Sequence, residues 1–220
     1  MKQSYSLLSN IGIMDHKDKG NIFIHPFNPQ NLKTTSYDVT IGKTFFRENP
    51  SKNVFNPFDV NDIKRYWGHP QQAVIAKDWM ESTHIQLSNI NPNDEIIVLA
   101  PGEFILAHTN EFIGGRNCVT SEMRAKSSMG RIGITVCKCA GWGSVGFCNR
   151  WTMEISNGLK ESVILVVGMR VAQIIFYQVD DLTKKGNYVS NGGLYQDTDD
   201  TQKMMDEWTP CSMLPKFSEK

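Results

Sequence analysis

The sequence predicts an all-β fold of the sandwich, jelly-roll or barrel type, with only a few short helices. Three observations predict it. Short apolar runs rich in Val, Ile and Phe recur through the second half of the chain, apolar residues alternate with polar or small ones, and Gly or Pro separates the runs. Such a pattern is typical of many short strands joined by turns.

The N-terminal part contains two predicted strands. Up to about Gly20 the chain reads as a short helix or extended arm followed by a charged turn. Residues 21–26 predict a short strand that ends at a proline. Residues 36–42 form a β-rich run, and we expect Gly42 to stop it.

Residues 47–92 break the β pattern. They contain scattered prolines, many Asn and Asp residues, and an amphipathic patch at 60–67 that predicts one short helix. We interpret them as an insertion in a single domain that spans residues 1–220. A partner surface or a lid is one reading, but a variable surface insertion is favoured. Trp67 and Trp79 are expected to anchor the insertion to the barrel.

From Glu95 the β signal is strong. Two units read as strand, tight turn and strand, with the turns near Gly102 and Gly168. The strands expected in this part are residues 96–99, 104–107, 132–136, 151–156, 163–167 and 171–177. After residue 179 the chain becomes rich in Gly, Asn and Asp, and we expect residues 180–220 to form a tail that is mobile unless something orders it.

The composition excludes some classes of function. The chain has 220 residues, enough for one sizeable core, and its 23 Lys and Arg residues balance 23 Asp and Glu residues. A nucleic-acid-binding protein usually has a basic excess, so a nucleic-acid partner is disfavoured. No apolar run is long enough to cross a bilayer and no signal peptide is seen, which predicts a cytoplasmic or nuclear protein with no membrane partner. Five cysteines without a secretion signal argue against a disulfide framework.

Residues 123–133 bring cations, hydroxyls and glycines together before a predicted strand. Backbone N–H groups and serine hydroxyls can hold phosphate oxygens, and Lys126 and Arg131 can supply countercharge. The order of residues is not that of a Walker A loop. Taken alone, the segment is more often just a polar turn.

Residues 139–147 form a glycine-dense loop around Trp142, which could wrap a flat base. In the strand that follows, Trp151, Met153 and Ile155 fall on one face and Glu154 on the other. Periodicity alone therefore predicts that Glu154 faces solvent.

Taken together, these segments resemble the dCTP deaminase family of the dUTPase-like superfamily. The resemblance lies in residues 126–131, 140–142, 146–147 and 154–157, and the spacing matches without gaps from Arg131 to Glu154. The framework segments 36–42, 100–104 and 167–176 are also similar. Most of the chain is covered, except residues 47–92 and about the last twenty.

The resemblance implies a homotrimer of distorted β-barrel or jelly-roll subunits with active sites between subunits. The implied reaction turns dCTP into dUTP and ammonia, and some members also cleave dUTP to dUMP. Mg²⁺ would be bound through the triphosphate, and zinc would not be used. Consistently, the H-x-E and P-C-x-x-C signature of zinc deaminases is missing, and Cys137 and Cys139 are poorly spaced for zinc. No protein ligand of a metal is predicted.

The resemblance also implies roles for individual residues. Glu154 matches the general base, which works best when partial burial raises its pKa. Ser127 and Arg131 match residues that orient this carboxylate and the water. The Ala140 carbonyl matches a group that holds the water or the amine. Further substrate contacts are implied for Lys126, Ser127 and Ser128 at the triphosphate, and for Gly141 and Trp142 at the base and sugar.

Two departures from the family pattern bear on activity. Ser144 stands where many members have an acidic residue; a serine can bind a sugar hydroxyl but is a poor base, which argues against diphosphatase activity. The tail keeps Tyr195 and Gln196, which are implied to contact substrate as the tail closes over the site, but Leu194 replaces a lysine. Lys184 and Lys185 are the candidates to compensate for that lost cation.

Hydrolytic deamination of dCTP is the favoured function. One alternative is a diphosphatase acting on dUTP or a modified pyrimidine nucleotide. Another is a nucleotide-binding relative with impaired catalysis, which the departures at Ser144 and Leu194 favour and the retention of Glu154, Ser127 and Arg131 opposes. A β-sandwich interaction module is disfavoured by the matched spacing.

Overall fold

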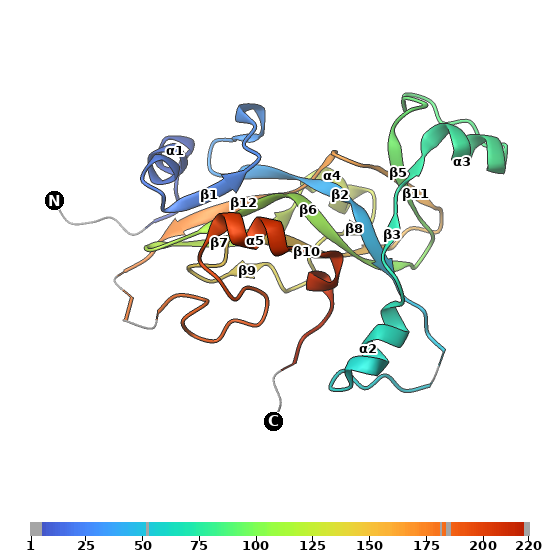
Figure 1. Cartoon of the computed structure of the whole chain (residues 1–220). Helices are drawn as coiled ribbons and strands as arrows, with labels where there is room; N and C mark the ends of the chain where they lie inside the picture. Colours follow the sequence, from blue (N-terminus) through green and yellow to red (C-terminus); the bar gives the residue numbers. More distant parts are fainter. Residues whose placement is uncertain (1–5, 52, 181, 184–185, 218–220) are drawn as a thin grey trace.

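The computed structural model describes residues 6–51, 53–180, 182–183 and 186–217. Within these residues the chain is mostly β, as the sequence predicts, with a few short helices at the periphery (Figure 1). A nine-stranded sheet curls into an open half-barrel, and its main path runs β8, β10, β6, β2, β12, β7 and β9. A three-stranded sheet, in the order β11, β5, β4, lies beside it.

The strands that pair are antiparallel to one another. The large sheet contains β1 (Ile22–His25), β2 (Tyr37–Arg47), β3 (Gln71–Gln72), β6 (Phe104–Gly115), β7 (Val119–Ala125), β8 (Ile134–Thr135), β9 (Trp142–Gly143), β10 (Arg150–Asn157) and β12 (Arg170–Gln178). The small sheet contains β4 (Val74–Ile75), β5 (Glu95–Leu99) and β11 (Val163–Val166).

Strand β10 shows how the sequence pattern builds the core. Trp151, Met153 and Ile155 are buried, whereas the residues between them are partly exposed. Successive side chains of a strand point to opposite faces, so one face of β10 packs in the core and the other carries polar groups. Burial of each large apolar side chain contributes roughly 1.5–3 kcal/mol, which fixes the register of the strand.

The two strand–turn–strand units are corners between sheets. Gly102 and Gly168 adopt positive φ values of 72° and 82°, as tight turns require. However, β5 pairs with β4 and β11, whereas β6 pairs with β1, β2 and β10. The predicted order of strand, tight turn and strand is present in both units, but the two strands of each unit belong to different sheets and do not pair with each other.

Gly42 does not end its strand. Strand β2 continues to Arg47, past the stop that the sequence predicts. A Cβ atom at Gly42 would collide with the ring of His108 on the neighbouring strand β6. The glycine is therefore a site of close packing, and the register between the two strands shifts between Ile41 and Phe45.

Residues 47–92 contain two helices, α2 (Val60–Trp67) and α3 (Ala76–Thr83), where the sequence predicts one. Trp67 is buried against Phe104 of β6, with ring centroids 5.5 Å apart. Trp79 packs in the small cluster around Met80 and Ile96. The two tryptophans thus attach the segment to different sheets.

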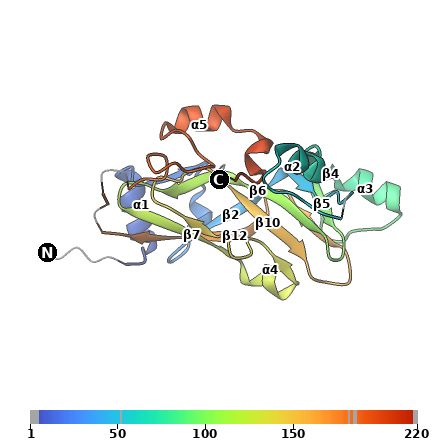
Figure 2. The same ribbon diagram turned by 90° about the horizontal axis from the view of Figure 1, so that it is seen from below.

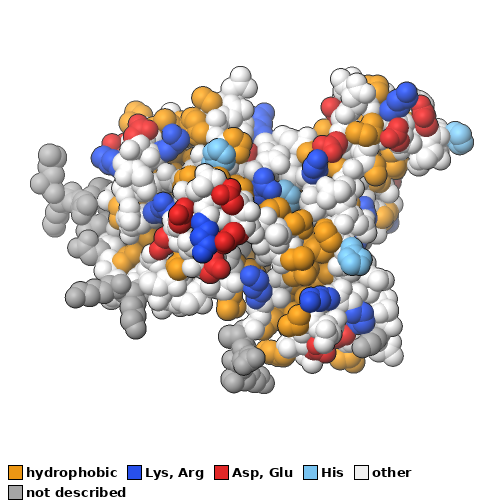
Figure 3. All heavy atoms as spheres, viewed as in Figure 1, with side chains coloured by type: hydrophobic (Ala, Val, Ile, Leu, Met, Phe, Trp, Pro, Cys, Tyr) orange, Lys and Arg blue, Asp and Glu red, His pale blue; other side chains and the backbone are white. Residues whose placement is uncertain are grey.

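The other helices are short: α1 (Asn10–Asp18), α4 (Ser127–Arg131), α5 (Thr201–Glu207) and 3₁₀ turns at Pro29–Asn31 and Pro210–Met213. Figure 2 shows α5 lying across one face of the curled sheet. Charged side chains cover the outer face of this helix, and apolar side chains gather between it and α2 (Figure 3). Among the described residues, none of the helices has the length and apolar character of a bilayer-crossing segment.

Candidate active site

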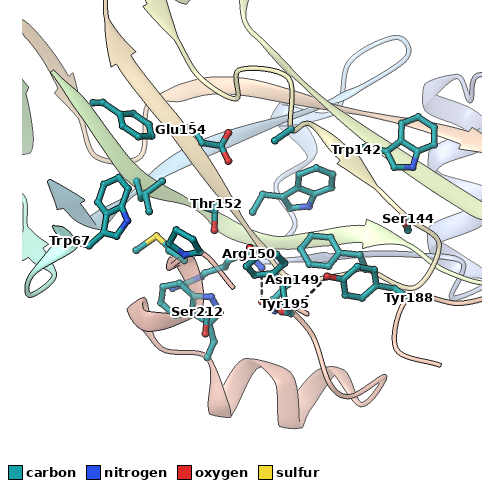
Figure 4. Close-up of a pocket in the computed structure, with 18 residues that line it drawn as sticks. Trp67, Trp142, Ser144, Asn149, Arg150, Thr152, Glu154, Tyr188, Tyr195 and Ser212 are labelled. Carbon is teal, nitrogen blue, oxygen red and sulfur yellow. Dashed lines mark hydrogen bonds between the residues drawn. The ribbon is translucent and has the colours of Figure 1, made fainter. Parts of the chain in front are cut away.

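A cavity of about 460 Å³ opens on the polar face of β10 (Figure 4). This volume lies in the range of small-molecule sites. Glu154, Thr152 and Arg150 follow one another along its floor, because alternate residues of a strand share a face. The loop after β8, helix α2, and the tail after residue 186 supply the walls.

Glu154 points into this cavity rather than into bulk solvent. Its side chain is partly buried, and within the described part of the chain its Oε2 atom is buried without a hydrogen-bond partner. Burial raises the pKa of the carboxyl group, and the nearby Lys138 ammonium opposes that rise. A partly buried carboxylate with one unpartnered oxygen and a raised pKa is suited to take a proton from water. The expectation from periodicity alone, a solvent-facing Glu154, is wrong because the tail and α2 cover this face.

Four predicted substrate contacts share the cavity with Glu154, and one of them, Tyr195, comes from the tail. Ala140, Trp142 and Ser144 line it from the glycine-dense loop. That loop is held in place by β9, in which Trp142 pairs with Glu122 of β7. Gly141 instead lies against the backbone: its carbonyl accepts a 2.7 Å hydrogen bond from the N–H of Met123, and a Cβ there would collide with the Met123 carbonyl.

The residues predicted to hold phosphates lie elsewhere on this chain. The segment 123–133, which the sequence alone suggests is a polar turn, is the end of β7 followed by the short helix α4. Ser127, Ser128 and Arg131 are exposed and do not line the cavity of Glu154. Arg131 donates to Ser127 Oγ at 3.1 Å, so these two side chains lie together. They do not share the cavity of Glu154, whose carboxylate the resemblance expects them to orient.

Lys126 has a partner inside the chain. Its ammonium lies 2.8 Å from both carboxylate oxygens of Asp38, which is fully buried. Arg170 adds a longer contact to Asp38 at 3.5 Å. Asp38 therefore acts as a structural partner that joins β2 to the start of α4 and to β12.

The tail is ordered by hydrogen bonds to the loop before β10. Gln196 accepts from the N–H of Cys148 at 2.9 Å and donates to the Gly146 carbonyl at 2.9 Å. Gln196 is buried and does not line the cavity, whereas Tyr195 does. Lys184 and Lys185 lie outside the described residues.

Sequence reasoning missed several cavity residues. Thr152 and Arg150 could have been found by extending the alternation of β10 backwards from Glu154. Tyr188 and Trp208 could not, because only the folded path of the tail brings them to this face. Trp208 packs on His108, with ring centroids 4.8 Å apart.

No group of three or more His, Cys, Asp or Glu side chains suited to a metal ion is found among the described residues. Cys137 is buried with its Sγ 3.5 Å from the Met123 carbonyl, whereas Cys139 is exposed.

Comparison with curated proteins gives relatives over most of the chain. A "dCTP deaminase, dUMP-forming" from Methanosphaerula palustris is 29% identical over 168 residues, which cover 76% of this chain and 78% of the relative. A "dCTP deaminase" from Halorubrum lacusprofundi is 28% identical over 198 residues, 89% of each chain.

Comparison with solved structures supports the fold. The 2′-deoxycytidine 5′-triphosphate deaminase from Agrobacterium tumefaciens matches with a TM-score of 0.57 at 16% identity. The match covers 87% of this chain and 53% of the other, so this chain spans about half of that protein's length.

The family model described as dCTP deaminase-like matches residues 7–179, a stretch that contains Glu154, the glycine-dense loop and every strand of both sheets. On these matches, this chain belongs to the dCTP deaminase-like family.

Proposed function

We propose that this protein hydrolyses dCTP to dUTP and ammonia, with Glu154 as the general base. The observation that carries the proposal is the partly buried Glu154 carboxylate, whose Oε2 atom has no hydrogen-bond partner among the described residues and which points into a cavity of nucleotide size. Membership of the dCTP deaminase-like family supplies the substrate class.

The proposed chemistry needs no protein-bound zinc. Glu154 takes a proton from a water molecule as the water oxygen attacks C4 of the cytosine ring, and the proton passes to ring N3. A second proton transfer through the same carboxyl releases the amino group as ammonia and leaves a C4 carbonyl. The resemblance assigns to the Ala140 carbonyl a hydrogen bond from the water or the amine, and Ala140 lines the cavity of Glu154.

The proposed product is dUTP rather than dUMP. Several curated relatives are named dUMP-forming, so cleavage of the triphosphate is the competing proposal. Ser144 lines the cavity, but a hydroxyl cannot act as the base for a second, phosphate-side water. We therefore expect deamination without diphosphate release.

The test is ammonia release combined with nucleotide chromatography, using dCTP, CTP, dUTP and dCMP in the presence of Mg²⁺. We expect dUTP and ammonia in equal amounts from dCTP, and loss of turnover in Glu154→Gln with nucleotide binding largely kept. Formation of dUMP would favour the diphosphatase reading, and binding without turnover would favour a catalytically impaired relative. Full activity of Glu154→Gln would refute the assignment of the base.

The proposal includes a homotrimer whose sites are completed by a neighbouring subunit. It rests on the exposure of Ser127, Ser128 and Arg131, which the resemblance assigns to the site but which lie apart from Glu154 on one chain. Mixing and reassembling Glu154→Gln with Arg131→Ala subunits tests it. Partial recovery of activity is expected if each site uses two subunits, and no recovery if each site is confined to one.

A further inference from the structure

Arg150 occupies a special position on the floor of the cavity. It begins β10 on the same face as Thr152 and Glu154, four residues before the proposed base. At a rise of about 3.3 Å per residue, the two backbone positions are roughly 13 Å apart. The cation therefore lies toward one end of the cavity and the carboxylate toward the other (Figure 4).

Two aromatic rings hold the Arg150 guanidinium in place. Its central carbon lies 4.8 Å from the ring centroid of Phe112 and 4.6 Å from that of Trp208. Cation–π contacts of this kind fix the plane of a guanidinium without using its N–H groups. Phe112 comes from the sheet and Trp208 from the tail, so the cation is oriented only when the tail is in place.

The hydrogen-bond donors of Arg150 are not used within the described part of the chain. Its backbone N–H donates to Asn149 Oδ1 at 2.8 Å, but no hydrogen bond or ion pair of its side chain is found there, and its Nε atom is buried without an acceptor. Glu111 acts on Arg150 through its charge, but both Glu111 carboxylate oxygens accept hydrogen bonds from Thr40. Burying a cation with unsatisfied donors is costly unless an acceptor arrives.

A purely structural role would use Arg150 as a clamp for the tail. Arg116 provides an internal comparison, because it also has a buried, unpartnered Nε, lies 5.9 Å from the ring centroid of Phe23, and contacts the tail. Arg116, however, donates to the Asp199 carbonyl and does not line the cavity. Arg150 lacks such an acceptor and faces the cavity, which favours a ligand with oxygen acceptors.

We infer that Arg150 binds a phosphate oxyanion of the nucleotide at the end of the cavity away from Glu154. This inference rests on the proposed function, since it extends the same site. A planar guanidinium matches the paired oxygens of a phosphate group. Arg150 would supply, from the sheet, a cation that the tail lacks at Leu194.

Calorimetric binding on the Glu154→Gln background tests the inference without turnover. The ligands are dCTP, deoxycytidine and inorganic tripolyphosphate. We expect Arg150→Gln to weaken dCTP and tripolyphosphate binding by about tenfold or more, the effect of losing charge-assisted hydrogen bonds, and to leave deoxycytidine binding unchanged. Arg150→Lys should recover part of the affinity. Arg116→Gln removes only a contact to the tail, so it should change dCTP and deoxycytidine binding by equal factors.

Two results would overturn the inference. One is an equal loss of dCTP and deoxycytidine binding in Arg150→Gln, which indicates a clamp for the tail. The other is unchanged binding of both dCTP and tripolyphosphate. Thermal unfolding of each variant shows whether it is folded, and Arg150→Lys serves if Arg150→Gln is not. If the protein fails to deaminate dCTP but shows Arg150-dependent tripolyphosphate binding, the proposed function fails while the anion site stands.

Discussion

The ammonium of Lys126 bonds both carboxylate oxygens of the fully buried Asp38, each at 2.8 Å, and so ties the start of α4 to β2. Lys126→Ala would leave a buried carboxylate with Arg170 as its remaining partner. We expect a loss of about 3 kcal/mol in the free energy of unfolding, measured by urea denaturation. Arg124 offers a control: its side chain is exposed and pairs with the partly buried Glu122, so Arg124→Ala should cost less than about 1 kcal/mol. Equal effects of the two changes would contradict a buried ion pair.

Removing the charge of Glu154 should make the protein more stable above the pH at which the carboxyl ionises. Burial raises the pKa of Glu154, so the folded chain keeps a proton that the unfolded chain has already lost. Stability contributed by this group therefore falls as the pH rises through the raised pKa. Glu154→Gln should gain about 1 kcal/mol near pH 8 and little near pH 4, as measured by thermal melts. A loss of stability near pH 8 would show that the carboxylate has a stabilising partner.

The side chain of Gln196 should control the order of the tail. It bonds the Cys148 N–H and the carbonyls of Gly146 and Thr198, and replacing it by Ala leaves these buried groups without partners. We expect amide hydrogen exchange in residues 186–217 to speed up by about tenfold or more, with the sheet unchanged. Gln202→Ala, on the exposed face of α5, is the matched control. Unchanged exchange in Gln196→Ala would mean that other contacts hold the tail.

His108 should make the protein sensitive to mild acid. Burial lowers the pKa of His108 from its ordinary 6.5 to about 4, so between these values the unfolded chain binds a proton that the folded chain does not. The free energy of unfolding should fall as the pH decreases through this window, by roughly 3 kcal/mol in total. His108→Gln should flatten this part of the pH–stability curve, whereas His69→Gln, at an exposed position, should not. A curve of the same slope in His108→Gln would assign the acid sensitivity to other groups.

The strands could be predicted because the sequence patterns that produce them lie within each strand. Alternation in β10 and the apolar runs of β11 and β12 reflect the burial of single strands, and a glycine with positive φ marks each corner. The strands before and after each of these turns pair with strands from distant parts of the chain, and those pairings are not encoded locally. The sequence around Gly102 therefore shows a turn but not that its strands enter different sheets. The prediction that Gly42 ends its strand is wrong for the same reason, because the side chain that requires a glycine there, His108, lies on another strand.

The candidate site could be predicted only in part. Glu154, Ala140, Trp142 and Ser144 were found through the resemblance, and the structure brings them to one cavity. Arg150 was missed because the resemblance gives it no role, although its strand position puts it on the same face as Glu154. The path of the tail brings Trp208 to the cavity, and no periodic pattern in the sequence predicts that position.

The match to the family model ends at residue 179, yet Tyr188, Tyr195 and Trp208 stand around the cavity. The floor of the site thus lies in the part of the chain that the family model matches, and much of its roof lies in the tail, whose described residues form no strand of either sheet. Substitutions in that roof can alter which ligand fits without disturbing strand register. The strands that form the floor can therefore stay unchanged in evolution while the tail changes, and with it the preferred ligand.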